Sequence, residues 1–242
     1  MYPIVMLHHV DDTGTENETG WSITHQKFID LLDCIEEQGL ITTTFEELYL
    51  SKAKPSKNKV IITFDDCYQS LFTFAIPELI RRKMKAVFYI PTAFIGGYNE
   101  WDVKEQGFNS FQIMNGGELL YLSNLGMEIG SHGHSHLRHN LITEQKLVFE
   151  LSHSKQILEK LLKKPVFSFA HPYGIVPKKI DVLLTDAGFH YGVAIYQAME
   201  SNSTLRRFGI HQSDTKKSIK FKLSKRYQLF RLLLDPVLHI LA

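Results

Sequence analysis

The sequence contains few of the features that mark secreted or membrane proteins. Only two cysteines, Cys34 and Cys67, occur in 242 residues, so a disulfide framework is excluded, although a single bridge would be possible. No apolar run approaches the ~20 residues of a membrane-spanning helix. The start, Met1–His9, lacks the basic segment and the long apolar segment of a signal peptide. These absences predict a soluble, cytoplasmic protein with reduced thiols.

A strong excess of charge of either sign is also absent. Lys and Arg number 27 and Asp and Glu number 26, so the net charge of +1 creates no general field that would attract nucleic acid. No internal repeat, low-complexity stretch or Gly/Ser linker divides the chain. Because 44% of the residues are hydrophobic, one sizeable core is possible. We predict a single domain over residues 1–242, with a C-terminal helix over residues 215–242.

Short apolar runs alternate along the chain with segments of helical periodicity. The predicted strands are Ile4–Leu7, Val60–Phe64, Ala86–Ile90, Met127–Gly130, Val166–Ala170, Tyr191–Ile195 and Arg207–Ile210. The predicted helices are Gln26–Gln38, Ser70–Lys83, Gly117–Leu125, Thr143–Leu162 and Pro177–Ala187. The stretch Gly96–Asn115 has no clear period, and we expect it to be a long loop over one face.

The alternation of strands and helices predicts an α/β fold with a parallel sheet. Continuous apolar strands such as Val60–Phe64 fit strands that are buried on both faces. An open doubly wound sheet and a barrel both satisfy this pattern.

Polar residues cluster directly after the predicted strands. In a parallel barrel, residues just past the carboxyl ends of the strands converge on one face, where active sites are built. We therefore expect these clusters to lie together: His8 and His9, Asp65 and Asp66, His132 and His136, His171–Gly174, and His211.

Two of these clusters suggest a metal site. Adjacent carboxylates at Asp65 and Asp66 need a cation, hydrogen bonds or a proton to offset their repulsion, although one of them could instead cap the next helix. His132 and His136 have the i, i+4 spacing that would place both rings on one side if the segment begins a helical turn, and His134 would then point elsewhere. One Asp and two His suit Zn²⁺ with an open position, although a His-rich surface turn would give the same spacing.

Three segments carry a resemblance to a known family. Thr63–Asp66, Glu128–His136 and Phe169–Gly174 resemble, in order and spacing, the first three motifs of the polysaccharide deacetylase family, carbohydrate esterase family 4. The resemblance implies a distorted (β/α)7 barrel forming a single domain. It also implies a metal-dependent hydrolase that cleaves linear amide C–N bonds and removes acetyl groups from N-acetylated sugars of a polysaccharide, oligosaccharide or glycan precursor.

The resemblance also implies roles for particular residues. Asp65 would be the catalytic base, and Asp66, His132 and His136 would hold a divalent metal, with Zn²⁺ expected first and Co²⁺, Ni²⁺ or Mn²⁺ as alternatives. The opening Val5–Val10 resembles a circularly permuted subgroup whose first strand carries the general acid. His8 is therefore assigned as the acid, with His9 second, and the C-terminal His239 is disfavoured because its surroundings are helical in pattern.

Three positions depart from the family pattern. Cys67 stands where a Gly is usual after the Asp pair, and His171 stands where a Tyr is usual. Ala170 stands where many members have an Arg that pairs with the catalytic Asp. We expect Arg206 or Arg207, at the start of the last predicted strand, to supply that charge.

Substrate contacts are expected from the third motif and from the long loop. We predict contacts from His171, Pro172 and Tyr173, with Tyr173 at the family's oxyanion position, and from Trp101. Phe94 and Tyr98 lie near Trp101 and offer further aromatic faces for a sugar ring. An equally simple alternative is that these aromatic residues only cover the mouth of the barrel.

Alternative functions remain at this point. The same site could hydrolyse a cyclic or small amide, or the chain could be a non-catalytic carbohydrate-binding relative. The expected partner is an acetylated carbohydrate and not nucleic acid. Residues 216–234 are basic and then apolar, so they could contact a membrane surface. We favour the simpler interpretation of a final helix packed on the barrel.

Overall fold

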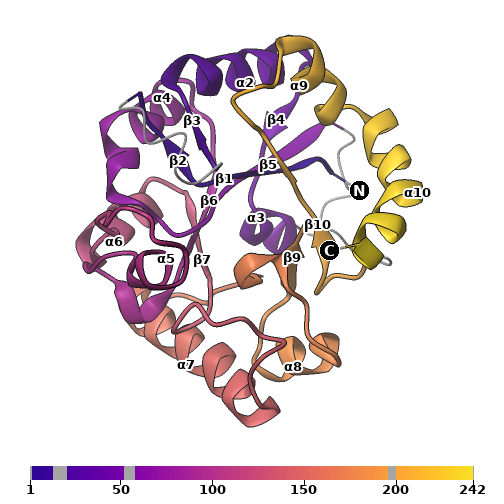
Figure 1. Ribbon diagram of the computed structural model, residues 1–242. Coiled ribbons are helices and arrows are strands. Elements are labelled where there is room, and N and C mark those ends of the chain that lie inside the picture. The colour runs from indigo at the N-terminus through magenta and orange to yellow at the C-terminus, as the bar shows by residue number, and fades with distance from the viewer. Residues whose placement is uncertain (1, 13–20, 52–57, 196–199, 242) are drawn as a thin grey trace.

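The strands form a parallel sheet that rolls up into a barrel (Figure 1). The computed structural model describes residues 2–12, 21–51, 58–195 and 200–241. The sheet has the order β10-β9-β8-β7-β6-β5-β1-β11, with β4 added beside β5. Its strands are β1 (Ile4–Leu7), β4 (Ile41–Thr42), β5 (Lys59–Phe64), β6 (Val87–Ile90), β7 (Glu128–Ser131), β8 (Ser168–Ala170), β9 (Tyr191–Ala194), β10 (Leu205–Arg206) and β11 (Phe208–Gly209).

The barrel closes through one extended segment that pairs on both sides. β10 pairs with β9, and β11, only one residue further along the chain, pairs with β1. Arg207 lies at the break between them, and its N–H donates to the carbonyl oxygen of Ala194 at 3.0 Å. Because β10 and β11 together form one broken strand, seven strands surround the axis. The predicted distorted (β/α)7 barrel is confirmed, and the open doubly wound sheet is excluded.

Most of the helices surround this barrel on the outside, whereas α3 (Phe45–Leu50) lies at the centre of the view, across one end of the barrel (Figure 1). Two short strands, β2 (His9–Val10) and β3 (Ser22–Ile23), form a separate parallel pair. The helices are α2 (His25–Glu37), α3 (Phe45–Leu50), α4 (Ala75–Arg81), α5 (Glu100–Gln106), α6 (Gly116–Asn124), α7 (Glu144–Leu162), α8 (Ile180–Asp186), α9 (Lys216–Leu223) and α10 (Lys225–Leu241), with short 3₁₀ turns at Gln69–Thr73, Thr92–Phe94 and Pro172–Gly174.

Several predicted boundaries are wrong. The stretch Gly96–Asn115 contains the helix α5, whose C-terminal Gly107 adopts a left-handed conformation. The predicted C-terminal helix is two helices, because Ser224 is extended (φ −80°, ψ 154°) between α9 and α10. The helix predicted over Ser70–Lys83 is a 3₁₀ turn followed by α4, broken at Phe74. The last predicted strand starts earlier, at Leu205, and breaks at Arg207.

The inside of the barrel is filled by residues at alternate strand positions. A buried cluster joins Ile4, Ile61, Val87 and Val193, and Phe45 at the start of α3 packs against it from the amino-terminal end. Tyr89 occupies the same interior, where a Cβ on Gly130 would come within 2.4 Å of its ring. This layer seals one end of the barrel interior, so the interior is open only towards the carboxyl ends of the strands.

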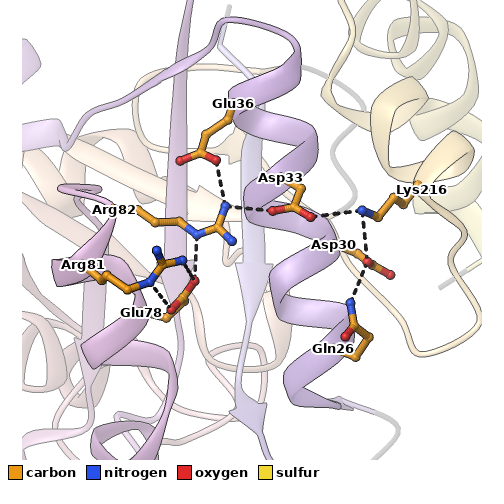
Figure 2. A network of polar contacts seen from close by, with 8 residues as sticks. All are labelled: Gln26, Asp30, Asp33, Glu36, Glu78, Arg81, Arg82 and Lys216. Atoms are coloured by element: carbon orange, nitrogen blue, oxygen red, sulfur yellow. Dashed lines mark hydrogen bonds and ion pairs between the residues drawn. The ribbon is translucent and has the colours of Figure 1, made fainter.

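A second, larger core lies between the strands and the surrounding helices. α2 contributes Phe28, Leu31 and Leu32 to it, and begins at Thr24, whose hydroxyl accepts from the N–H of Lys27. On its outer surface α2 is linked to both neighbours by the ion pairs in Figure 2. Asp33 contacts Arg82 at 2.9 Å beyond the end of α4 and Lys216 at 3.0 Å at the start of α9. Partly exposed pairs contribute little stability individually, but these show that α9 packs against the first long helix.

Candidate active site

A pocket of ≈ 280 Å³ opens at the carboxyl end of the barrel. Its wall brings together side chains from four strand ends, namely those after β1, β5 and β7 and at the break before β11. The residues involved are His8, Asp65, Asp66, His132 and Arg207, with His136 and Tyr173 from the adjoining loops. The polar clusters predicted after different strands therefore meet in one place, because a parallel barrel directs all its strand ends to one face.

Asp66, His132 and His136 form a buried cluster of suitable geometry for a metal ion. One ligand atom from each lies within 4.8 Å of the other two. The Nε2 atoms of His132 and His136 lie 3.6 Å and 3.4 Å from Asp66 Oδ1. Donor atoms on a tetrahedral Zn²⁺ with bonds of about 2.0–2.1 Å are separated by about 3.3 Å. Among the described residues, none forms a hydrogen bond with the buried Asp66 Oδ1, as expected of a metal ligand.

Neighbouring groups orient the two imidazoles. His132 donates from Nδ1 to the Ala170 carbonyl oxygen at 2.9 Å, which leaves the Nε2 lone pair for the cluster. The ring of His136 stacks on Trp101 with centroids 4.6 Å apart. Asp66 and His136 both adopt positive φ values, 67° and 52°. Such strained backbone at two of the three ligand positions is typical of functional sites.

Asp65 lies beside this cluster and is held by a buried arginine. Arg207 donates from Nη1 to Oδ1 at 2.6 Å and from Nη2 to Oδ2 at 2.7 Å, and it also reaches the Thr63 hydroxyl at 3.1 Å. Burial alone would raise the pKa of Asp65, but Arg207, followed by His132, holds it well below its ordinary value. Asp65 is therefore ionised at neutral pH. Of the two arginines expected to replace the one missing at Ala170, the structure selects Arg207.

The C-terminal helix supports this arginine from behind. Arg231 of α10 donates to the carbonyl oxygen of Arg207 and, at 2.6 Å, to that of Ile195. Asp235 neutralises Arg231 through contacts of 2.9 Å and 2.6 Å and lies 3.2 Å from Arg206. Arg206 therefore belongs to this supporting layer and not to the pocket. Sequence periodicity alone contained no signal for this long-range contact.

The two N-terminal histidines occupy different positions. His8 Nε2 lies 4.0 Å from Asp65 Oδ2, whereas the His9 ring stacks on Tyr68 with centroids 3.6 Å apart. Burial lowers the pKa of His8, against the opposing effects of Asp65 and Asp66. Burial also lowers the pKa of His9, to about 3. The geometry therefore favours His8 over His9 for proton exchange with Asp65.

Three of the four residues predicted to contact substrate do not line the pocket. His171 is fully buried and donates from Nε2 to the carbonyl oxygen of Ser203 at 3.0 Å. Pro172 is buried beside it, and Trp101 is only 5% exposed because its ring covers His136. Tyr173 does line the pocket, with Arg138 over its ring at 3.8 Å. The predictions for His171, Pro172 and Trp101 are corrected to supporting positions behind the wall.

Other residues of the pocket wall escaped the sequence analysis. Asp102 of α5 accepts from the Tyr68 hydroxyl at 2.9 Å and from Gln106 at 2.8 Å. Burial, followed by the charge of Asp66, raises the pKa of Asp102 to about 6. Trp21 is 39% exposed at the rim and lies 5.3 Å from the His8 ring. Asp102 was missed because the segment that contains α5 has no regular period.

Comparison with known protein families agrees with this geometry. The family model described as polysaccharide deacetylase matches residues 52–192, which is more than half of the chain. The chain belongs to the polysaccharide deacetylase family. His8 and Arg207, which both approach Asp65, lie outside the matched residues. The surroundings of Asp65 are thus completed from the two ends of the chain.

Individual relatives are more distant. A poly-β-1,6-N-acetyl-D-glucosamine N-deacetylase of Staphylococcus aureus is 25% identical over 197 residues, covering 76% of this chain and 64% of the relative. The chain therefore matches just under two thirds of that relative's length. Among solved structures, the Streptococcus pyogenes deacetylase PplD has a TM-score of 0.76 at 20% identity, covering 92% of this chain and 98% of that one. IcaB from Ammonifex degensii has the same TM-score at 17% identity, covering 92% and 96%. These structures share the fold.

Proposed function

We propose that this protein is a metal-dependent hydrolase that removes acetyl groups from N-acetylated sugars of a polysaccharide, oligosaccharide or glycan precursor. One observation carries the proposal: an ionised carboxylate, Asp65, lies beside a buried Asp-His-His cluster but is not part of it. A protein that only binds sugar needs no such group. A hydrolase needs it to accept the proton of the attacking water.

The metal would be held by Asp66, His132 and His136. The family depends on divalent metals, and one carboxylate with two imidazoles suits Zn²⁺ first, with Co²⁺, Ni²⁺ or Mn²⁺ as alternatives. When bound, the ion would polarise the acetyl carbonyl and lower the pKa of a bound water towards about 7.

Asp65 is the proposed general base. Arg207 holds both of its oxygens, which fixes the plane of the carboxylate and keeps it ionised. Its Oδ2 lies 4.0 Å from His132 Nε2, so a water bound next to His132 would be within reach of this oxygen. Arg207 thus acts as a positioning residue for Asp65.

His8 is the proposed general acid. Hydrolysis of an amide requires a proton for the leaving nitrogen, because an amide anion is a poor leaving group. Burial lowers the pKa of His8, so we propose that it receives its proton during the reaction from a group in the site. Asp65, 4.0 Å from His8 Nε2, is the group placed to supply it.

The proposed substrate class is a polymer that contains N-acetylglucosamine. The Staphylococcus aureus relative is named for such a polymer. Tyr173, which we propose contributes the oxyanion donor, and the partly exposed Trp21 provide aromatic surface on the wall, while Asp102 and Gln106 offer polar groups for hydroxyls.

Acetate release tests the proposal directly. The purified protein should release acetate from N-acetylglucosamine oligomers, lose this activity on chelation, and regain it with Zn²⁺ or Co²⁺. Metal content should be measured in parallel. Stoichiometric metal without release from any acetylated sugar, but with hydrolysis of cyclic or small amides, would favour that second activity. Sugar binding without any hydrolysis would favour a non-catalytic relative.

A further inference from the structure

The last helix, α10, presents its polar side chains to the barrel. Gln228, Arg231 and Asp235 are buried, and they recur at three- or four-residue intervals on the inward face. Arg231 is held there by Asp235 and by the carbonyl oxygens of Arg207 and Ile195. Among the side chains of α10 that the structure describes, the fully buried ones are therefore polar, with Tyr227 partly buried against Phe208, whereas α2 buries Phe28, Leu31 and Leu32.

The outward face of α10 is apolar. Leu229 is 63% exposed, Phe230 is 49% exposed, and Leu232 and Leu234 are also exposed. Nearby on α9, Phe221 is exposed and its ring contacts Tyr227 edge-on. A helix on the surface of a globular protein usually has the opposite arrangement, with its apolar stripe facing the core. This inverted arrangement indicates that something apolar covers α10.

The charges around this face indicate what the cover is. From residue 216 onwards the sequence has seven basic residues and one acidic residue, Asp235, which is buried. Acidic side chains of neighbouring segments pair with Lys216, Lys220 and Lys222. Lys225 and Arg226, at the start of α10, are exposed, and within the described residues neither takes part in an ion pair. Lys225 and Arg226 thus place positive charge at the start of the apolar face.

We propose that the outward face of α10, defined by Lys225, Arg226, Leu229, Phe230, Leu232 and Leu234, binds the surface of an anionic lipid bilayer. Apolar side chains would enter the boundary between headgroups and acyl chains, and the cations would contact anionic headgroups. A second copy of this face is a poorer partner, because two positive borders would repel each other. Along the described ranges, no helix is both long enough and apolar enough to cross a bilayer, so the contact would be superficial.

Vesicle flotation with the full chain tests this proposal. The protein should float with vesicles that contain phosphatidylglycerol and phosphatidylcholine, and bind pure phosphatidylcholine vesicles more weakly. Raising the salt concentration should weaken binding to the anionic vesicles, because it screens the headgroup charge. Failure to bind anionic vesicles at low salt would overturn the proposal.

Substitutions distinguish vesicle binding through this face of α10 from non-specific binding. Leu229→Gln with Phe230→Gln should weaken binding to anionic vesicles by about tenfold or more, and Lys225→Gln with Arg226→Gln should act similarly. The matched control is Val182→Gln on α8, an exposed apolar position (60%) elsewhere on the barrel, which should leave binding unchanged. Equal effects of the control and α10 variants would overturn the proposal. The proposal would also be overturned if light scattering showed a dimer of the wild-type protein that the α10 variants abolish while these variants still bind vesicles.

Discussion

The two ends of the barrel each bury a carboxyl group, and they treat it in opposite ways. Asp65, at the carboxyl end of β5, is paired with Arg207, which holds the pKa of Asp65 well below its usual range. Glu128, at the start of β7, accepts from the Ser168 hydroxyl at 2.5 Å and from the N–H of Glu46 at 2.8 Å. Without a cation beside it, burial raises the pKa of Glu128 to about 7.

One end of the barrel thus holds a charged carboxylate beside the pocket, and the other end holds a protonated carboxyl group within the packed core. A buried carboxylate stays charged only where a cation offsets its lost hydration, and this barrel supplies that cation at the end with the pocket. At the sealed end, neutral donors suffice for a carboxyl group that keeps its proton. The same residue chemistry thus provides an ionised carboxylate at one end and a neutral packing element at the other.

Removing the charge of Asp65 should have the largest effect. Asp65→Asn keeps the shape of the side chain but cannot accept a proton, so acetate release should fall by about 10³-fold or more. Metal content should stay at the wild-type level, because Asp65 is outside the Asp66, His132 and His136 cluster. Near-normal turnover with metal retained would show that Asp65 is not the base.

Removing the cation should make Asp65 resemble Glu128. Arg207→Gln removes the largest influence that opposes burial, so the pKa of Asp65 should rise and the acidic limb of the pH–rate profile should move to higher pH. Breaking the buried pair should also cost about 3–5 kcal/mol of stability.

Arg206→Gln is the matched control for that experiment. Arg206 is also buried, but it pairs with Asp235 and not with Asp65. It should lose stability without moving the acidic limb. If both variants shift the acidic limb of the pH–rate profile equally, the shift reflects lost stability and not the pairing of Arg207 with Asp65. The contrast between Asp65 and Glu128 would then not hold.

The pH dependence of stability should reveal Glu128. Its folded pKa of about 7 exceeds the unfolded value of 4.5, so the folded state binds the proton more tightly. The stability it contributes is therefore present below pH 4.5 and lost as the pH rises through 7. Glu128→Gln should remove this loss and raise the free energy of unfolding at pH 8 by on the order of 2 kcal/mol relative to wild type. Denaturant titrations of both proteins at pH 5 and pH 8 measure this difference in the free energy of unfolding. Acetate release by Glu128→Gln should be unchanged.

Cys67, next to the metal cluster, should show the smallest effect. Its φ of 57° is strained for a residue with a Cβ, and its side chain is fully buried. Cys67→Gly loses packing but gains backbone freedom, so stability should stay within about 1 kcal/mol of wild type. Cys67→Ala keeps the strain and loses the sulfur, so it should be less stable than Cys67→Gly. The reverse order, measured by thermal unfolding, would contradict a strained turn.

Local sequence patterns predicted much of the barrel but little of the wall that surrounds the site. The strand Ile4–Leu7 has the predicted bounds, because continuous apolar runs are characteristic of strands buried on both faces. The Asp65-Asp66 and His132/His136 motifs indicated the residues that the structure brings together as a buried Asp-His-His cluster. Asp102 and the helix α5 were missed, since seven residues with no apolar stripe leave no periodic signal. Trp101 was given the wrong position because an aromatic residue has the same sequence signature whether it faces a pocket or supports a histidine.

By itself, the sequence determined the alternation of strands and helices and the residues that follow each strand, since both depend on local periodicity and on the single end to which parallel strands point. Only the tertiary structure decided which groups meet around Asp65. Arg207 reaches it across 142 positions of sequence, and it does so because the closing strand breaks at that residue. The inverted face of α10 was decided in the same way: only the docked barrel shows which side of an apolar and basic helix is turned outward.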